Sequence, residues 1–104
     1  MATKNIELVE NDLLPYLNVE WSGQDITSYT IELHVRYEDG TKITRSAVVD
    51  DYNVGGAGTA LFHFEWQAGD LITGTHTAEI EATNPSAENE TWQGLRLIIT
   101  EEIA

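Results

Sequence analysis

The sequence contains no cysteine, and this absence excludes a disulfide framework, a thiolate nucleophile and a thiolate metal site. The opening residues, MATKNIELVEND, lack the apolar core of a signal peptide and carry acidic residues where a targeting segment is basic. Apolar runs extend over only a few residues, which is too short to span a bilayer. We therefore expect neither a secretory leader nor a membrane anchor.

Basic residues are scarce. Five lysines and arginines stand against 18 acidic residues, which gives a net charge of −13. Nucleic acid binding needs basic side chains that displace counterions, and an anionic membrane surface attracts basic segments, so we expect neither partner. The acidic surface either serves solubility or meets a basic partner protein.

The length of 104 residues predicts a single domain spanning residues 1–104, with an ordered core at about 6–100. Hydrophobic residues make up 41% of the chain, which is too many for a disordered protein. A chain of this size can bury a core without metal or disulfide support.

Hydrophobic residues alternate with polar ones at a period of two. In residues 29–37 every odd position is apolar or aromatic and every even position is polar, the pattern of a strand with one buried face. Asp39-Gly40 then predicts a hairpin turn. Residues 67–71 could form one helical turn, and the stretches 54–58 and 84–90 are predicted loops. The expected strands cover residues 6–9, 17–21, 29–37, 42–49, 60–66, 76–82 and 95–100. About seven short strands indicate an all-β fold, an antiparallel β-sandwich.

Five stretches resemble the N-terminal domain of phage baseplate upper proteins, and the last of them, residues 95–99, lies where its closing strand runs. Residues 25–35 are similar to its opening motif, and residues 39–41 match its "DGT" hairpin. Residues 66–71 match its "W-x-x-x-D-L" corner, and residues 74–80 its "G-x-Y-x-A-E-I/F" strand. The chain departs from the pattern at Ser28, which replaces a glycine, and at His76, which replaces an aromatic residue. The resemblance implies an immunoglobulin-like sandwich located in a phage virion and made in the host cytoplasm.

Catalytic and cofactor motifs are not apparent, and we expect no enzyme activity, no cofactor and no metal. The pattern H-E-x-x-H and the Gly-x-Ser-x-Gly elbow do not occur. His34 and His63 fall on polar strand faces, whereas His76 is in register with apolar residues. Residues 50–53, Asp-Asp-Tyr-Asn, offer oxygen ligands, but they lack the spacing of a calcium loop. The glycines at 55–58 lead into a strand and are not followed by Lys-Ser/Thr, so they do not form a phosphate loop.

Aromatic residues provide the candidates for binding. Alternation places Tyr29, Phe62, Phe64 and Trp66 in the core. Two others fall at loop ends, and together with the glycine-rich loop they give the predicted interface residues: Tyr52, Gly55, Gly56 and Trp92.

These features favour a non-enzymatic virion structural protein that docks on a symmetric tail, baseplate, neck or capsid assembly. Its partners would be other phage virion proteins, and repetition of subunits in such assemblies allows a small homo-oligomer. The alternative is a module that adsorbs to host polysaccharide through exposed aromatic side chains. The two differ in surface: glycan binding needs clustered exposed aromatics, whereas protein docking needs a contiguous apolar patch with a polar rim.

Overall fold

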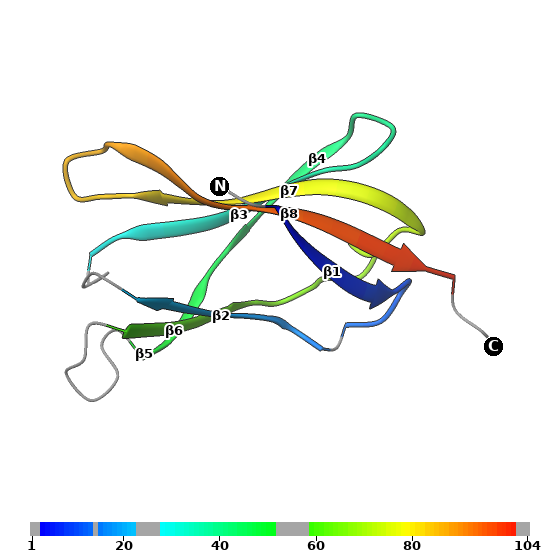
Figure 1. Ribbon diagram of the computed structural model, residues 1–104, viewed down its shortest axis with the longest axis horizontal. Helices are drawn as coiled ribbons and strands as arrows, with labels where there is room; N and C mark the ends of the chain where they lie inside the picture. The colour runs from blue at the N-terminus through cyan, green and yellow to red at the C-terminus, as the bar shows by residue number, and fades with distance from the viewer. Residues whose placement is uncertain (1–2, 14, 23–27, 52–58, 102–104) are drawn as a thin grey trace.

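The structure, a computed structural model, describes residues 3–13, 15–22, 28–51 and 59–101. This part of the chain forms strands, turns and loops, and none of it is helical. Two layers of strands face each other (Figure 1). The strands are β1 (Lys4–Val9), β2 (Leu17–Ser22), β3 (Thr30–Arg36), β4 (Lys42–Ser46), β5 (Val48–Asp51), β6 (Thr59–Phe64), β7 (Gly74–Thr83) and β8 (Asn89–Thr100). The predicted all-β sandwich is confirmed.

The larger sheet has the strand order β1-β8-β7-β3-β4, and the smaller sheet has the order β2-β6-β5. All neighbouring strands are antiparallel except β1 and β8, which run parallel from the pair Lys4 and Leu95 to the pair Val9 and Thr100. In Figure 1 their arrowheads point the same way. The expected sandwich is therefore antiparallel except at this edge. Parallel neighbours need a long connection, and here the rest of the domain supplies it.

The expected strand at residues 42–49 is two strands, so the described residues contain eight strands where about seven were expected. β4 pairs with β3 in the larger sheet, whereas β5 pairs with β6 in the smaller one. Ala47 lies between them, and its N–H donates to the carbonyl of Ile31 at 2.9 Å. The chain thus changes sheets at Ala47 within a continuous run of extended residues, which a period-two pattern does not reveal.

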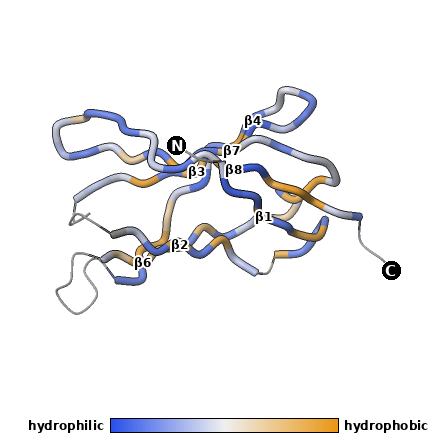
Figure 2. The backbone as a smooth tube through the Cα atoms, in the orientation of Figure 1, coloured by the Kyte–Doolittle hydropathy of each residue, from blue (hydrophilic) through white to orange (hydrophobic). Residues whose placement is uncertain are grey.

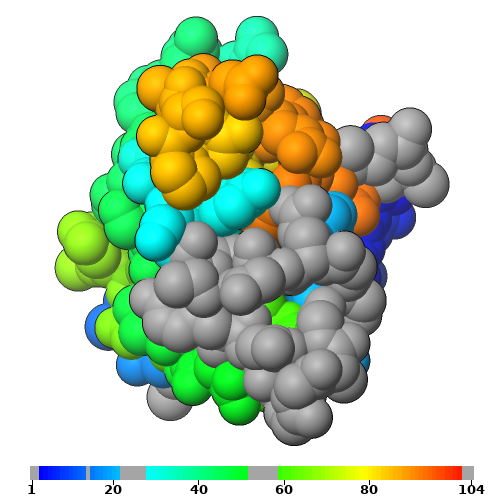
Figure 3. Space-filling model, turned by 90° about the vertical axis from the view of Figure 1, so that its left-hand side faces the viewer, coloured from blue at the N-terminus to red at the C-terminus, as the bar shows by residue number. Residues whose placement is uncertain are grey.

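The loop expected at residues 84–90 is a tight turn, and β8 begins at Asn89. The Asn84 side-chain oxygen accepts hydrogen bonds from the N–H groups of Ser86 and Glu88, at 2.9 and 3.0 Å. Ala87 adopts a φ of 62°, in the left-handed region. Figure 3 shows this turn, in orange, beside the start of β3, in cyan. The asparagine side chain closes the turn early, so β7 and β8 form a long hairpin.

The core fills the space between the sheets, and hydrophobic residues recur along both layers (Figure 2). Phe62, Phe64 and Trp66 are buried, as the alternation predicts. Tyr29 is half-buried and packs against the core. Leu33 and Leu97 complete it from the larger sheet. No helix that could cross a bilayer occurs among the residues that the structure describes.

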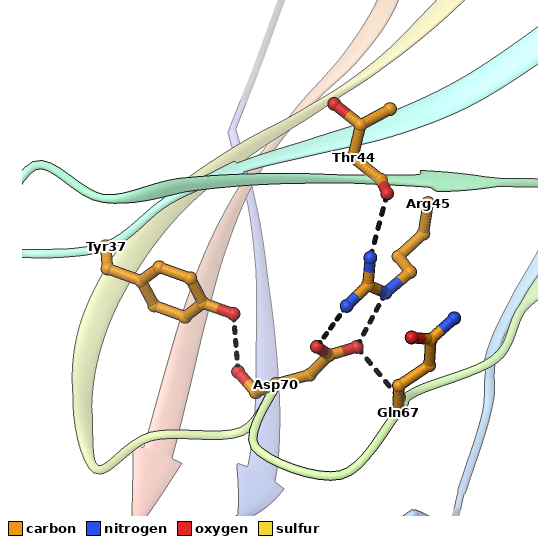
Figure 4. Close-up of polar contacts among 5 residues, drawn as sticks. All are labelled: Tyr37, Thr44, Arg45, Gln67 and Asp70. Atoms are coloured by element: carbon orange, nitrogen blue, oxygen red, sulfur yellow. Dashed lines mark hydrogen bonds and ion pairs between the residues drawn. The ribbon is translucent and has the colours of Figure 1, made fainter.

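A polar cluster joins the two sheets at the connection between β6 and β7 (Figure 4). The expected helical turn at residues 67–71 is a single hydrogen-bonded turn, in which the Asp70 N–H donates to the Gln67 carbonyl at 3.0 Å. The buried Asp70 carboxylate accepts hydrogen bonds from Arg45 and from the Gln67 N–H. The Tyr37 hydroxyl donates to the Asp70 carbonyl at 2.7 Å. These contacts fix the chain where it returns to the larger sheet.

Candidate functional site

Three of the four predicted interface residues, Tyr52, Gly55 and Gly56, lie outside the described residues. The fourth, Trp92, is described, and its expected exposure at a loop end is wrong: only 3% of the residue is accessible. An indole in this position fills the core and cannot act as an exposed anchor.

A β-bulge explains why Trp92 faces inward. Along β8 the buried residues Leu95, Leu97 and Ile99 occupy odd positions. A regular strand alternates between its two faces, so an even position such as 92 would lie on the outer face. The pairing with β7 shifts between Ile80 and Glu81, whose partners are Gln93 and Thr91, so Trp92 is the extra residue. Bulges change the direction of the side chains beyond them. The phase change returns Trp92 to the core.

Trp92 lies in an aromatic cluster. Its ring stacks on that of Trp21 with centroids 4.4 Å apart and an interplanar angle of 5°. Tyr29 and Phe62 lie at 6.1 and 6.4 Å in tilted arrangements. Yet the indole Nε1 of Trp92 is shielded from solvent and has no hydrogen-bond partner in the part of the chain described. A buried donor left unpaired costs about 1–3 kcal/mol, so this N–H offsets part of the stabilisation that the aromatic packing provides.

Trp92 also lines a groove of about 350 Å³ at the open side of the sandwich. Five consecutive residues of β2, from Leu17 to Trp21, border this groove. Successive residues of a strand point to opposite faces, so a groove that touches all five runs along the strand edge. The remaining lining comes from the larger sheet: Lys4, Ile6, Ile80, Trp92, Gln93 and Leu95.

The sheet edge along the groove belongs to β2. Within the described residues β2 is the outermost strand of the smaller sheet, and its one strand neighbour is β6. On the opposite wall, the pairing of β1 with β8 begins at Leu95. Exposed strand edges present backbone N–H and C=O groups that can pair with another chain. The groove therefore has a largely apolar lining and lies beside β2, whose outer edge has no strand partner among the described residues.

The polar residues of the lining sit beside this apolar floor. Lys4, Asn18 and Glu20 are exposed, whereas Leu17 is buried and Val19 is half-buried. An apolar centre with a polar border is the composition of a protein-docking surface. Sequence reasoning missed the groove because it is formed by β2 and by the ends of β1 and β8, which are distant in the chain.

Exposed aromatic side chains do not gather on one face of the described structure. Tyr16 is the most exposed aromatic residue in the described ranges, with 38% of its surface accessible. It stacks on the His63 ring with centroids 5.1 Å apart, on the outer face of the smaller sheet. Val48 and Leu61 are also exposed on this sheet. This arrangement lacks the clustered aromatic platform that the polysaccharide alternative needs.

Two of the histidines have clear structural partners. His76 is buried as its apolar register predicts: its Nδ1 accepts from the Glu38 N–H at 3.1 Å, and its Nε2 donates to the Ile72 carbonyl at 2.7 Å. His63 contacts Asp50 through Nδ1 and Glu65 through Nε2, each at 2.9 Å. The two acidic side chains raise the pKa of His63, with the hydrogen bond to Asp50 as the largest cause. The expectation that the sequence holds no His-x-Glu spacing is wrong, because His63, Phe64 and Glu65 form one.

No protein-family model, no curated protein and no solved structure matches this chain.

Proposed function

We propose that this protein is a non-enzymatic structural protein of a bacteriophage virion, and that it docks by accepting an extended segment of another virion protein along β2. The segment would add a fourth strand to the smaller sheet. Main-chain hydrogen bonds would then supply affinity, and the side chains that enter the groove would supply specificity.

The observation that carries this proposal is the coincidence of two features in one groove. Within the described residues β2 pairs on one side only, with β6, and the residues that line the groove beside it are largely apolar. A groove bordered by five residues of β2 accommodates a segment of about the same length, because paired strands have the same rise per residue.

Charge and sequence restrict the partner further. At a net charge of −13 the protein repels other acidic surfaces, so the partner segment is neutral or basic with apolar side chains at alternate positions. The resemblance to baseplate upper protein domains supports a tail or baseplate position, although a neck or capsid would offer the same kind of contact. Phage assemblies are symmetric, so each particle would carry many copies.

The test uses two lysine substitutions in the same sheet. Val19→Lys places a charged side chain in the groove, whereas Val48→Lys is the matched control on β5, the opposite edge strand, where Val48 is 44% exposed. Co-sedimentation with assembled tails and capsids is measured for both variants and the wild type. We expect Val19→Lys to weaken association at least tenfold and Val48→Lys to leave it unchanged. Circular dichroism and thermal melting establish that both variants are folded.

Two results would contradict the proposal. Equal co-sedimentation of wild type and a folded Val19→Lys variant would mean that docking does not use the groove. Retention on a host-polysaccharide column without any co-sedimentation would favour the host-adsorption alternative.

A further inference from the structure

Three potential metal ligands meet on the outer face of the larger sheet, away from the β2 groove. Glu32 and His34 are two residues apart on β3 and share that face, because their neighbours Ile31, Leu33 and Val35 point into the core. Glu81 on β7 lies directly opposite Glu32 in the antiparallel register. Strand alternation and register therefore bring one imidazole and two carboxylates together.

The distances in this cluster suit a shared cation. The His34 Nε2 lies 3.9 Å from a carboxylate oxygen of Glu32 and 3.7 Å from one of Glu81. The three ligand atoms all lie within 4.8 Å of one another. Both contacts are too long for a hydrogen bond. Two ligand atoms bound tetrahedrally to one Zn²⁺ are about 3.4 Å apart, given metal–ligand bonds of about 2.0–2.2 Å, so small rotations of the glutamates would complete the geometry.

The His34 ring is held with Nε2 toward the carboxylates. Its Nδ1 lies 3.1 Å from the hydroxyl of Thr44, the residue opposite His34 on β4. Nε2 itself is shielded from solvent and has no hydrogen-bond partner among the described residues. Metal-binding histidines are commonly oriented through the other ring nitrogen in this way. When the Thr44 hydroxyl accepts the Nδ1 proton, the lone pair of Nε2 faces two negative charges, an arrangement that a cation relieves.

The surrounding charges leave the cluster electronegative. Glu79 lies opposite His34 in the register and adds a third carboxylate to this face. Arg36 and Lys42 border a shallow hollow of about 300 Å³ on this face, but no lysine or arginine in the described ranges forms an ion pair with Glu32 or Glu81. Like charges directly opposite each other on neighbouring strands are destabilising. His34 and Glu81 both line the hollow, and their side chains are 35% and 27% exposed, so a cation can approach the cluster from this side.

We propose that Glu32, His34 and Glu81 form a Zn²⁺ site in which the His34 Nε2 and one oxygen of each glutamate are the ligands. Imidazole and carboxylate together suit Zn²⁺, whereas Ca²⁺ takes six to eight oxygen ligands, which this cluster does not provide. Three protein ligands leave one tetrahedral position for water or for a side chain of a neighbouring subunit. The metal would link β3 to β7 and cancel the repulsion between the glutamates. This inference does not depend on the docking proposal.

Isothermal titration of metal-free protein with Zn²⁺ tests the site. We expect saturable binding of one Zn²⁺ per chain and no binding of Ca²⁺. His34→Gln and Glu81→Gln should each weaken Zn²⁺ binding more than tenfold, and Thr44→Val should weaken it about 10–100-fold because it frees the ring. His63→Gln is the matched control, since it removes an imidazole that is also flanked by two carboxylates.

A nitrogen-correlated NMR spectrum of the histidine rings provides a second measurement. On Zn²⁺ addition the His34 Nε2 resonance should shift while its Nδ1 resonance retains the signature of a protonated nitrogen. The proposal is overturned if His34→Gln binds Zn²⁺ as tightly as the wild type, if His63→Gln abolishes binding, or if no saturable binding is found.

Discussion

Arg45 and Asp70 form a two-point contact in which the Arg45 Nε donates to Oδ2 of Asp70 at 2.8 Å and its Nη2 donates to Oδ1 (Figure 4). Arg45 belongs to β4, the edge strand of the larger sheet, whereas Asp70 lies in the turn between β6 and β7. The contact therefore ties an edge strand to the connection between the sheets. Burial, followed by the charge of Asp70, raises the pKa of Tyr37, whose hydroxyl bonds the Asp70 backbone.

Removing the carboxylate should destabilise the fold strongly. In Asp70→Ala the Arg45 guanidinium and the Gln67 N–H lose their acceptor, and breaking one side of a buried pair costs about 3–5 kcal/mol. Urea unfolding measures this loss. The double variant Asp70→Ala/Arg45→Met should be more stable than Asp70→Ala alone, because no unpaired charge remains. Equal stability of Asp70→Ala and wild type would show that the contact does not hold the turn.

Phe64→Ala should reduce the free energy of unfolding by about 3–5 kcal/mol, as large-to-small changes in a core do. Phe64 is fully buried and contacts Phe62 edge-on, with ring centroids 5.8 Å apart. Leu61→Ala on the same strand is the matched control. Leu61 points outward and is 36% exposed, so its removal should cost well under about 1 kcal/mol. Similar losses for the two variants would contradict the assigned faces of β6.

The stability of the protein should depend on pH through His63. Asp50 and Glu65 raise the pKa of His63 in the folded state above its unfolded value of about 6.5. The stabilisation from the charged imidazole is fully present below about pH 6.5 and is lost as the pH rises through the folded pKa. Melting temperatures measured across this window should fall for the wild type more than for His63→Gln. Parallel pH profiles for the two proteins would show that these contacts do not favour the charged imidazole.

Two substitutions at Trp92 separate the contribution of its packing to stability from the cost of its unpaired indole N–H. Trp92→Ala should destabilise the fold by about 3–5 kcal/mol because it leaves a cavity beside Trp21. Trp92→Phe keeps an aromatic ring and removes the Nε1–H that lacks an acceptor. We expect its cost to stay below about 1 kcal/mol, because losing the unpaired donor offsets part of the lost packing. A much larger loss for Trp92→Phe would indicate that the indole N–H is hydrogen-bonded in solution.

The amino-acid sequence predicts the strands well wherever alternation is unbroken. Phe62, Phe64 and Trp66 are buried as expected, and Asp39-Gly40 forms the expected hairpin turn, with Gly40 at a φ of 90°. These features depend on local preferences, which the pattern contains in full. The expectation of few helical residues holds in the described chain for the same reason.

The predictions from sequence fail where a local pattern of residues does not determine how distant strands pair. Ala47 continues an extended run while the chain changes sheets, and the bulge at Trp92 reverses the phase of β8. Alternation is unbroken through Ala47, and at Trp92 the change of phase follows from the register against β7, which the pattern of β8 alone does not contain. The parallel pair of β1 and β8 and the groove along β2 depend on residues far apart in the chain. The Glu32–His34–Glu81 cluster likewise requires the register of β3 against β7.

The central claim is that a partner segment pairs with β2, and a cryo-electron microscopy map of the protein bound to the phage assembly on which we propose it docks tests this most directly. We expect an added strand along the edge from Leu17 to Trp21, which would make the smaller sheet four-stranded. A map in which the protein is attached through another surface while the edge of β2 stays unpaired would contradict it.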